Sequence, residues 1–162
     1  MAESLEINQM LANAYEPKRM FRWILEIDGI DAFTATSAAR PSKTIDKTVI
    51  DYINQKIYHA GKTEWQPISI TLHDPIAPSA AQKVTTWLNL VHNSQIGRMG
   101  YASFYKKNFS LKMLDGPGNV IEKWNYVGAF PTSINYGELN YENSDTMKIQ
   151  MEIQMDDCVL EF

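Results

Sequence analysis

The stretch TMKIQMEIQMD, residues 146–156, alternates between polar and apolar side chains without interruption. Its apolar positions hold only methionine and isoleucine, and its polar positions hold mainly amides and acids. A period of two is typical of a β-strand with one buried and one wet face. At ~3.3 Å per residue such a stretch spans roughly 36 Å, whereas an ordinary strand has about five or six residues. The pattern predicts a long strand over residues 146–156, in a sheet that extends beyond a compact core.

Length and composition favour a single domain with a core. The chain has 162 residues, of which 44% are hydrophobic, and four tryptophans. No window reaches 18 apolar residues, so we expect no membrane-spanning helix. The N-terminus lacks the basic start and apolar centre of a secretory signal. The single cysteine, Cys158, excludes an internal disulfide and a zinc site of several thiolates.

Charge is distributed unevenly along the chain. Residues 111–162 hold three lysines and nine acidic residues, a net charge of −6, whereas residues 1–110 have a net charge of +2. Tight binding of nucleic acid requires a concentrated positive field. The acidic C-terminal part therefore indicates a surface that does not grip a polyanion, or simply a solvated acidic surface.

The chain divides into an arm and one domain. Residues 1–19 predict an N-terminal arm, because Pro17 and the polar run around it interrupt the short apolar pattern. Residues 20–162 form the domain. Within it, residues 44–59 are rich in β-branched and polar side chains but poor in core-forming bulk. They predict an extended β-hairpin that projects from the core or pairs with another chain.

The remaining patterns complete the fold class. We expect one convincing helix over about 79–93, with Ser79 as its N-cap and Val84 and Trp87 on its apolar face. A loop is expected over 128–143. Further strands are expected at 20–28, 33–36, 65–72, 109–114 and 120–127. The sequence thus predicts a mainly β protein, a β-sandwich or partly closed barrel of about seven or eight strands with one flanking α-helix and an extended β-hairpin.

No residue pattern indicates chemistry. The histidines His59, His73 and His92 lie on different expected elements and lack the spacing of metal ligands. The Gly-Pro-Gly at 116–118 lacks the lysine and the helix of a phosphate-binding loop. We therefore expect no catalytic, cofactor-binding or metal-binding residues, no cofactor and no enzymatic activity.

Four stretches together resemble the tail tube proteins of contractile-tailed bacteriophages, the myovirus tail tube family, which is related to the tube proteins of type VI secretion systems and pyocins. Their order and spacing over roughly residues 20–160 carry the resemblance. The first comprises 21–27, Phe33 and 38–41; the second 54–57, 60–61, Trp65 and 68–72; the third 81–84 and Trp87; the fourth Gly128, 130–132, 137–139, Tyr141 and 143–145.

The resemblance implies a structural virion protein. In the family, six copies form a ring whose inner strands join into one β-barrel around a lumen, and the rings stack into a tube. The implied partners are further copies of the chain, a tail sheath protein, baseplate or tube-initiator and tail-terminator proteins, and a tape-measure protein inside the lumen. Double-stranded DNA would pass through the lumen without sequence-specific contact and without a membrane anchor. The implied location is the virion tail tube, assembled in the cytoplasm of the host bacterium.

Two sets of candidate site residues follow from the residue patterns and the expected assembly. The hairpin is expected to contact other subunits or stacked rings through Thr44, Ile45, Val49, Ile50, Tyr52, Asn54, Lys56, Ile57 and Tyr58. The polar positions of the alternating stretch are expected to face the lumen; these are Gln150, Glu152, Gln154 and Asp156.

Two alternatives stay open. A type VI secretion or pyocin-like contractile injection system would use the same kind of tube but deliver a different cargo. A monomeric ligand-binding β-barrel would instead require an apolar internal pocket and would remain a particle of about 18.5 kDa.

Overall fold

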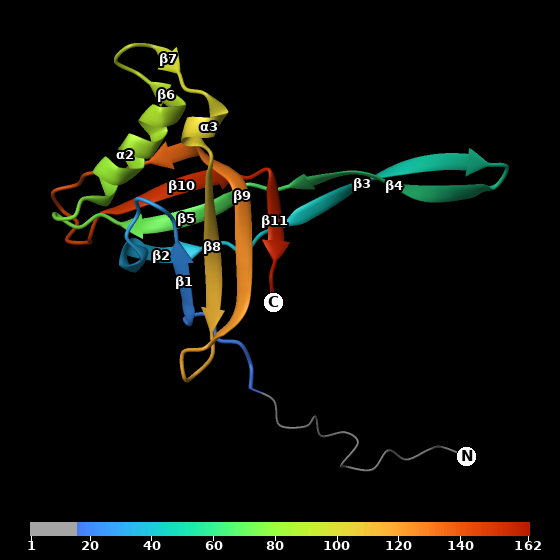
Figure 1. Cartoon of the computed structure of the whole chain (residues 1–162), viewed down its shortest axis with the longest axis horizontal. Coiled ribbons are helices and arrows are strands. Elements are labelled where there is room, and N and C mark those ends of the chain that lie inside the picture. The colour runs from blue at the N-terminus through green and yellow to red at the C-terminus, as the bar shows by residue number, and fades with distance from the viewer. Residues whose placement is uncertain (1–15) are drawn as a thin grey trace.

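A computed structural model describes residues 16–162, and the part of the predicted arm that precedes residue 16 lies outside the described residues. Eleven strands, one long helix and two short helical turns make up the described chain (Figure 1). The strands are β1 Trp23–Glu26, β2 Ala35–Ala38, β3 Lys43–Tyr52, β4 Gln55–Trp65, β5 Ile68–His73, β6 His92–Asn93, β7 Arg98–Met99, β8 Lys107–Leu114, β9 Val120–Asn135, β10 Lys148–Gln154 and β11 Asp157–Leu160. The helical elements are η1 Ala32–Thr34, α2 Ala80–Val91 and α3 Ala102–Tyr105.

One seven-stranded antiparallel sheet forms the body, in the order β1-β8-β9-β10-β5-β2, with β11 also paired to β9. The first half of β9 pairs with β8 and β11, and its second half pairs with β10. The strands β10, β5 and β2 run across the direction of β1, β8 and β11 (Figure 1). The predicted class is confirmed: the protein is mainly β, with one main helix and an extended hairpin, and its sheet does not close into a barrel.

Buried side chains of β1, β8, β9, β11, β5, β10 and α2 form one core. Ile70 and Leu72 of β5 and Met151 of β10 are buried together with Val84 and Trp87 of α2. Ser79 caps the helix as predicted, because its side chain accepts a hydrogen bond from the Gln82 N–H. The helix therefore covers one face of the sheet and leaves the opposite face open.

The predicted strand over 146–156 is wrong in its length. β10 has seven residues, and after a break at Met155 and Asp156 the chain continues as β11 along the first half of β9. The Asp156 N–H donates to the Val127 carbonyl within the break. The alternation of buried and exposed residues shifts by one position there: Met155 and Cys158 are both buried although they lie an odd number of residues, three, apart. An extra residue in a strand produces this shift.

The predicted loop over 128–143 is also wrong in its first half, because β9 runs through to Asn135. Gly128 adopts a φ of +64°, and a Cβ at this position would lie 2.2 Å from Asp156 Oδ2. Glycine alone permits both this conformation and this close approach. It therefore lets β9 bend from one half of the sheet to the other. Pro131 follows on a strand edge, where proline is tolerated.

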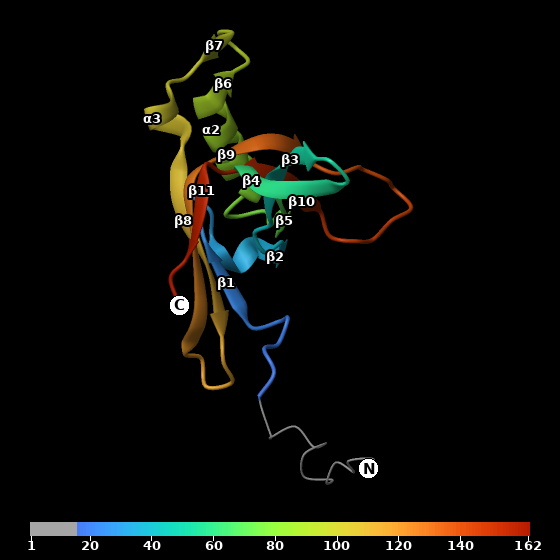
Figure 2. The ribbon, with the colours of Figure 1, turned by 90° about the vertical axis from the view of Figure 1, so that its right-hand side faces the viewer.

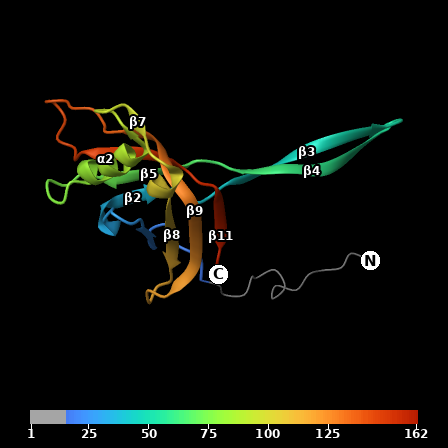
Figure 3. The ribbon, with the colours of Figure 1, turned by 45° about the horizontal axis from the view of Figure 1, so that its top comes forward.

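The hairpin β3-β4 stands apart from the body as a two-stranded sheet of its own. Figures 1 and 3 show it projecting from the sheet, and Figure 2 looks along it toward the body. Every residue of the hairpin is exposed except Trp65 at its root. The chain thus contains a long pair of strands with no partner among the residues that the structure describes.

Candidate functional site

The open face of the β9-β10-β5-β2 sheet carries small polar side chains in rows. Opposite residues of antiparallel strands share a face, so the register defines each row. The first row contains Ser37, Thr71, Gln150 and Asn135; the second contains Ser69, Glu152 and Ser133; the third contains His73 and Lys148. Hydroxyls and amides dominate, with one carboxylate and one ammonium between them. This is a nearly neutral polar wall, on the face opposite α2.

The four candidate lumen residues do not all belong to this wall. Gln150 and Glu152 are exposed on it, as their alternation predicts. The half-buried Gln154 instead donates its amide to the Trp65 and Met155 carbonyls, 2.9 and 3.2 Å away. Asp156 lies in the break after β10 and accepts from Lys106 Nζ at 2.6 Å. The structure thus brings two of the four together.

The candidate contact residues lie on a hairpin with two different faces. From Thr48 and His59 out to the turn, one face is free of charge and presents Ile50, Ile57 and Tyr52, with Gln55 beside them; Asp46 lies on this face nearer the root. The other presents Val49 and Tyr58 between Lys47 on one side and the pair Asp51 and Lys56 on the other. Lys47 Nζ lies 5.7 Å from the centre of the Tyr58 ring, which is a cation–π contact. Among the remaining candidates, Thr44 and Ile45 lie near the root, and Asn54 lies in the turn.

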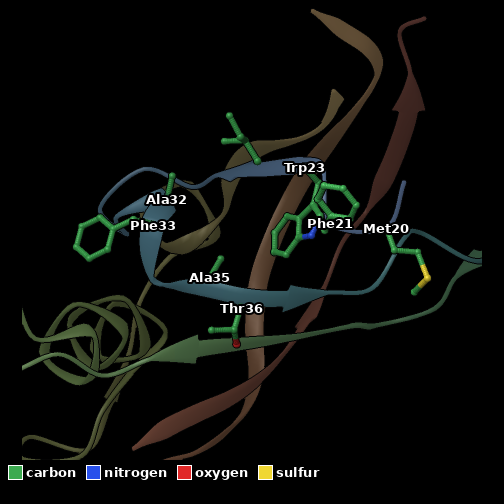
Figure 4. Close-up of a pocket in the computed structure, with 8 residues that line it drawn as sticks. Met20, Phe21, Trp23, Ala32, Phe33, Ala35 and Thr36 are labelled. Carbon is green, nitrogen blue, oxygen red and sulfur yellow. The ribbon is translucent and has the colours of Figure 1, made fainter. Parts of the chain in front are cut away.

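The two outer strands of the polar sheet, β2 and the second half of β9, have edges that no strand of the described residues pairs with. β2 is the last strand in the order, and the part of β9 beyond Ala129 pairs only with β10. An apolar hollow of about 720 Å³ lies beside the β2 edge, between β1 and β2. Figure 4 shows Phe21, Trp23 and Phe33 around it. Met20, Phe21 and Phe33 are exposed, so an edge with apolar surroundings lacks a cover within the described chain.

A buried carboxylate ties three segments together near the root of the hairpin. Glu122 on β9 accepts from Lys18, from Trp124 Nε1 and from Arg40 Nη2, the last at 2.6 Å. Burial would raise the pKa of the Glu122 carboxyl, but the hydrogen bonds from Lys18 and Trp124 and the charge of Arg40 hold it below its ordinary value. Sequence reasoning missed this cluster. The available signal was that Glu122 shares the parity of the apolar Trp124 and Tyr126 on an expected strand.

The described residues offer little for catalysis. No group of three or more histidine, cysteine, aspartate or glutamate side chains in residues 16–162 could hold a metal ion. Burial, followed by the charge of Asp157, raises the pKa of the Cys158 thiol to about 11, so it is protonated at neutral pH. Within the same range, no helix is long and apolar enough to span a membrane.

Solved structures share the whole fold. The structure of the anti-feeding prophage cap (AFP tube terminating cap) matches with a TM-score of 0.74 at 18% identity, covering 97% of this chain and 99% of that one. A chain of the PVC sheath-tube complex, an extracellular contractile injection system in the extended state, matches with a TM-score of 0.72 at 16% identity, covering 98% and 99%. Hcp1 from Flavobacterium johnsoniae matches with a TM-score of 0.51 at 12% identity, covering 87% and 95%.

Sequence comparison assigns the family. No curated protein sequence matches this chain significantly. The family described as T4-like virus tail tube protein gp19, however, matches residues 19–158, which is most of the chain. This span includes the polar sheet face, the hairpin and both free edges. The chain therefore belongs to the T4-like virus tail tube protein gp19 family and is a tail tube protein of the contractile type.

Proposed function

We propose that six copies of this chain form a ring, and that the rings stack into the inner tube of a contractile phage tail, through which the genome is ejected. The observation that carries this proposal is the combination of a neutral polar sheet face with two unpaired edges. A polar sheet face needs no cover, but an unpaired edge does.

The strand directions support closure of a ring. Each neighbouring pair among β9, β10, β5 and β2 is antiparallel. Because the strand direction reverses at each of these three pairings, β2 runs in the direction opposite to β9. In a rotationally symmetric ring, the β2 edge of one copy would therefore meet the β9 edge of the next as an antiparallel pair. Closure would also cover the apolar hollow beside β2.

The polar wall would then face the lumen. Lysine and arginine on such a wall would bind DNA phosphates and hold the polymer in place. Here the wall offers Gln150, Glu152 and small hydroxyl side chains, and Lys148 is its single lysine. DNA could slide along this surface. Replacing Glu152 with lysine should change the binding of a charged probe confined to the lumen, and an unchanged signal would contradict this placement.

The proposed partners follow from the family and from the solved relatives. They are a sheath around the tube, a baseplate or initiator at one end, a terminator at the other, and a tape-measure protein inside. The particle would be assembled in the host cytoplasm and carry the tube in its virion tail. The proposed role is structural rather than enzymatic.

A type VI secretion or pyocin-like tube is the second candidate function. The likeness to Hcp1 and to the PVC sheath-tube complex favours it, although at these identities the likeness concerns the fold alone. Neighbouring genes distinguish the two, because capsid and terminase genes indicate a phage.

The test is assembly of hairpin variants. Ile50 and Ile57 are exposed on the charge-free hairpin face. A carboxylate at either position should leave the subunit folded but prevent its polymerisation, because the interface would have to bury an unpaired charge. Electron microscopy of Ile50→Asp and Ile57→Asp should show no tubes. Normal tubes from both variants would contradict the role of the hairpin.

A further inference from the structure

The hairpin and the loop before β10 lie at opposite ends of the polar sheet. The hairpin follows the end of β2 and precedes the start of β5. At the other end, Lys148 at the start of β10 pairs with His73 at the end of β5, and β9 ends at Asn135. The loop 136–147 therefore emerges from the sheet end that the hairpin does not occupy. In stacked rings of one orientation, these two ends would face each other.

The loop is acidic and partly apolar. Residues 136–147 contain Glu138, Glu142 and Asp145 and no lysine or arginine. Leu139 is 88% exposed and Tyr141 fully exposed. The loop borders a hollow of about 600 Å³, and a second hollow of about 350 Å³ lies beside it, bordered by Phe33 and Met147 among others. This end thus offers concave surface, exposed apolar side chains and negative charge together.

One face of the hairpin has the complementary chemistry. Val49 and Tyr58 are exposed apolar groups, and Lys47 and Lys56 flank them. Asp51 lies opposite Lys56 on this face, so the two lysines leave it a net positive charge. β3 has ten residues, which at ~3.3 Å each extend about 33 Å. The hairpin is therefore long enough to reach well beyond its own subunit. Its opposite, charge-free face with Ile50 and Ile57 lacks this match to an acidic surface, so in the proposed tube it would pack against a different, uncharged surface.

We propose that the Lys47/Lys56 face of the hairpin docks on loop 136–147 of a second copy in the neighbouring ring. This inference rests on the proposed stacked tube and adds the receiving surface to it. Apolar contact between Val49 or Tyr58 and the loop would supply stability. Pairing of Lys47 and Lys56 with Glu138 and Glu142 would fix the register, because charge complementarity selects orientation and partner more than it adds affinity.

Charge reversal with rescue tests the docking. Full-length chains carrying Glu138→Lys/Glu142→Lys, or Lys47→Glu/Lys56→Glu, are polymerised separately and measured by light scattering and electron microscopy. Each double variant should lose most tube elongation, at least tenfold in rate, while six-fold rings still form. A mixture of the two double variants would still contain hairpin–loop contacts between like charges. The rescue is therefore one chain that carries all four substitutions, the quadruple variant. It should elongate again, because every hairpin and loop then carries the reversed pair.

The matched control keeps the charge of the loop. Glu138→Asp/Glu142→Asp shortens the side chains without changing their sign and should elongate within about twofold of the unaltered chain. Normal elongation of the lysine loop variant would overturn the docking while leaving the tube in place, and so would failure of the quadruple variant to recover. If the unaltered chain forms neither rings nor tubes, the proposed function itself fails, and the docking fails with it.

Discussion

β5 and β3 have similar side chains and opposite environments. Ile68, Ile70 and Leu72 of β5 are buried in the core, whereas Ile45, Val49 and Ile50 of β3 are exposed. Both strands are paired with an antiparallel neighbour. The difference shows that branched apolar residues specify extended structure but do not specify the partner that covers it. For β5 the partner is in the same chain; for β3 we infer that it is another copy.

The largest expected effect on stability lies in the buried strand. Replacing Ile70 with alanine removes a fully buried side chain and leaves a cavity. Such changes cost about 2–5 kcal/mol of unfolding free energy. Chemical denaturation measures this loss when both chains also carry Ile57→Asp, which should keep the subunits from assembling. A loss under about 1 kcal/mol would contradict the contrast with the hairpin.

Glu122→Gln tests the junction between the body and the hairpin root. Arg40, which lies just before β3, forms an ion pair with the Glu122 carboxylate. Hydrogen bonds to charged groups contribute about 1.5–3 kcal/mol, so we expect a loss of that order near pH 7. The folded-state pKa of Glu122 lies below its unfolded value. Its stabilisation is therefore present above about pH 5 and is lost as the pH falls through the folded pKa.

The variant should thus differ most from the unaltered chain at neutral pH and approach it in acid. Denaturation at a series of pH values measures this convergence. A constant difference between the two chains from pH 7 to pH 3 would show that the carboxylate charge is not what stabilises the junction.

The smallest expected effect on stability is in the hairpin. Ile50→Ala changes an exposed side chain with no partner in the described chain, so the free energy of unfolding should change by no more than about 0.5 kcal/mol. The same denaturation series used for Ile70→Ala provides the comparison. A loss as large as that of Ile70→Ala would mean that Ile50 is buried within its own subunit.

Local patterns predicted the elements better than their junctions. The alternation identified Ile149, Met151 and Ile153 as buried and Gln150 and Glu152 as exposed, and the β-branched run located the hairpin. These features depend on neighbours in sequence. The sequence also predicted a tail tube family through its resemblance, and the family match confirms this prediction.

The junctions depend on residues far apart in sequence. Gly128 suggested a loop, but its closeness to Asp156 makes it the bend of a continuous strand. The break after β10 is held by the hydrogen bond from the Asp156 N–H to the Val127 carbonyl, and no local sequence pattern reveals this contact. Likewise, Glu122 is buried because Lys18 and Arg40 reach it from separate segments. The same break removes Asp156 from the polar wall.

The most direct measurement is electron microscopy of the purified full-length chain at increasing concentration. The account predicts six-fold rings and hollow filaments, because the two sheet edges and the hairpin then find their partners in other copies. A particle that stays monodisperse at about 18.5 kDa under all conditions would contradict it.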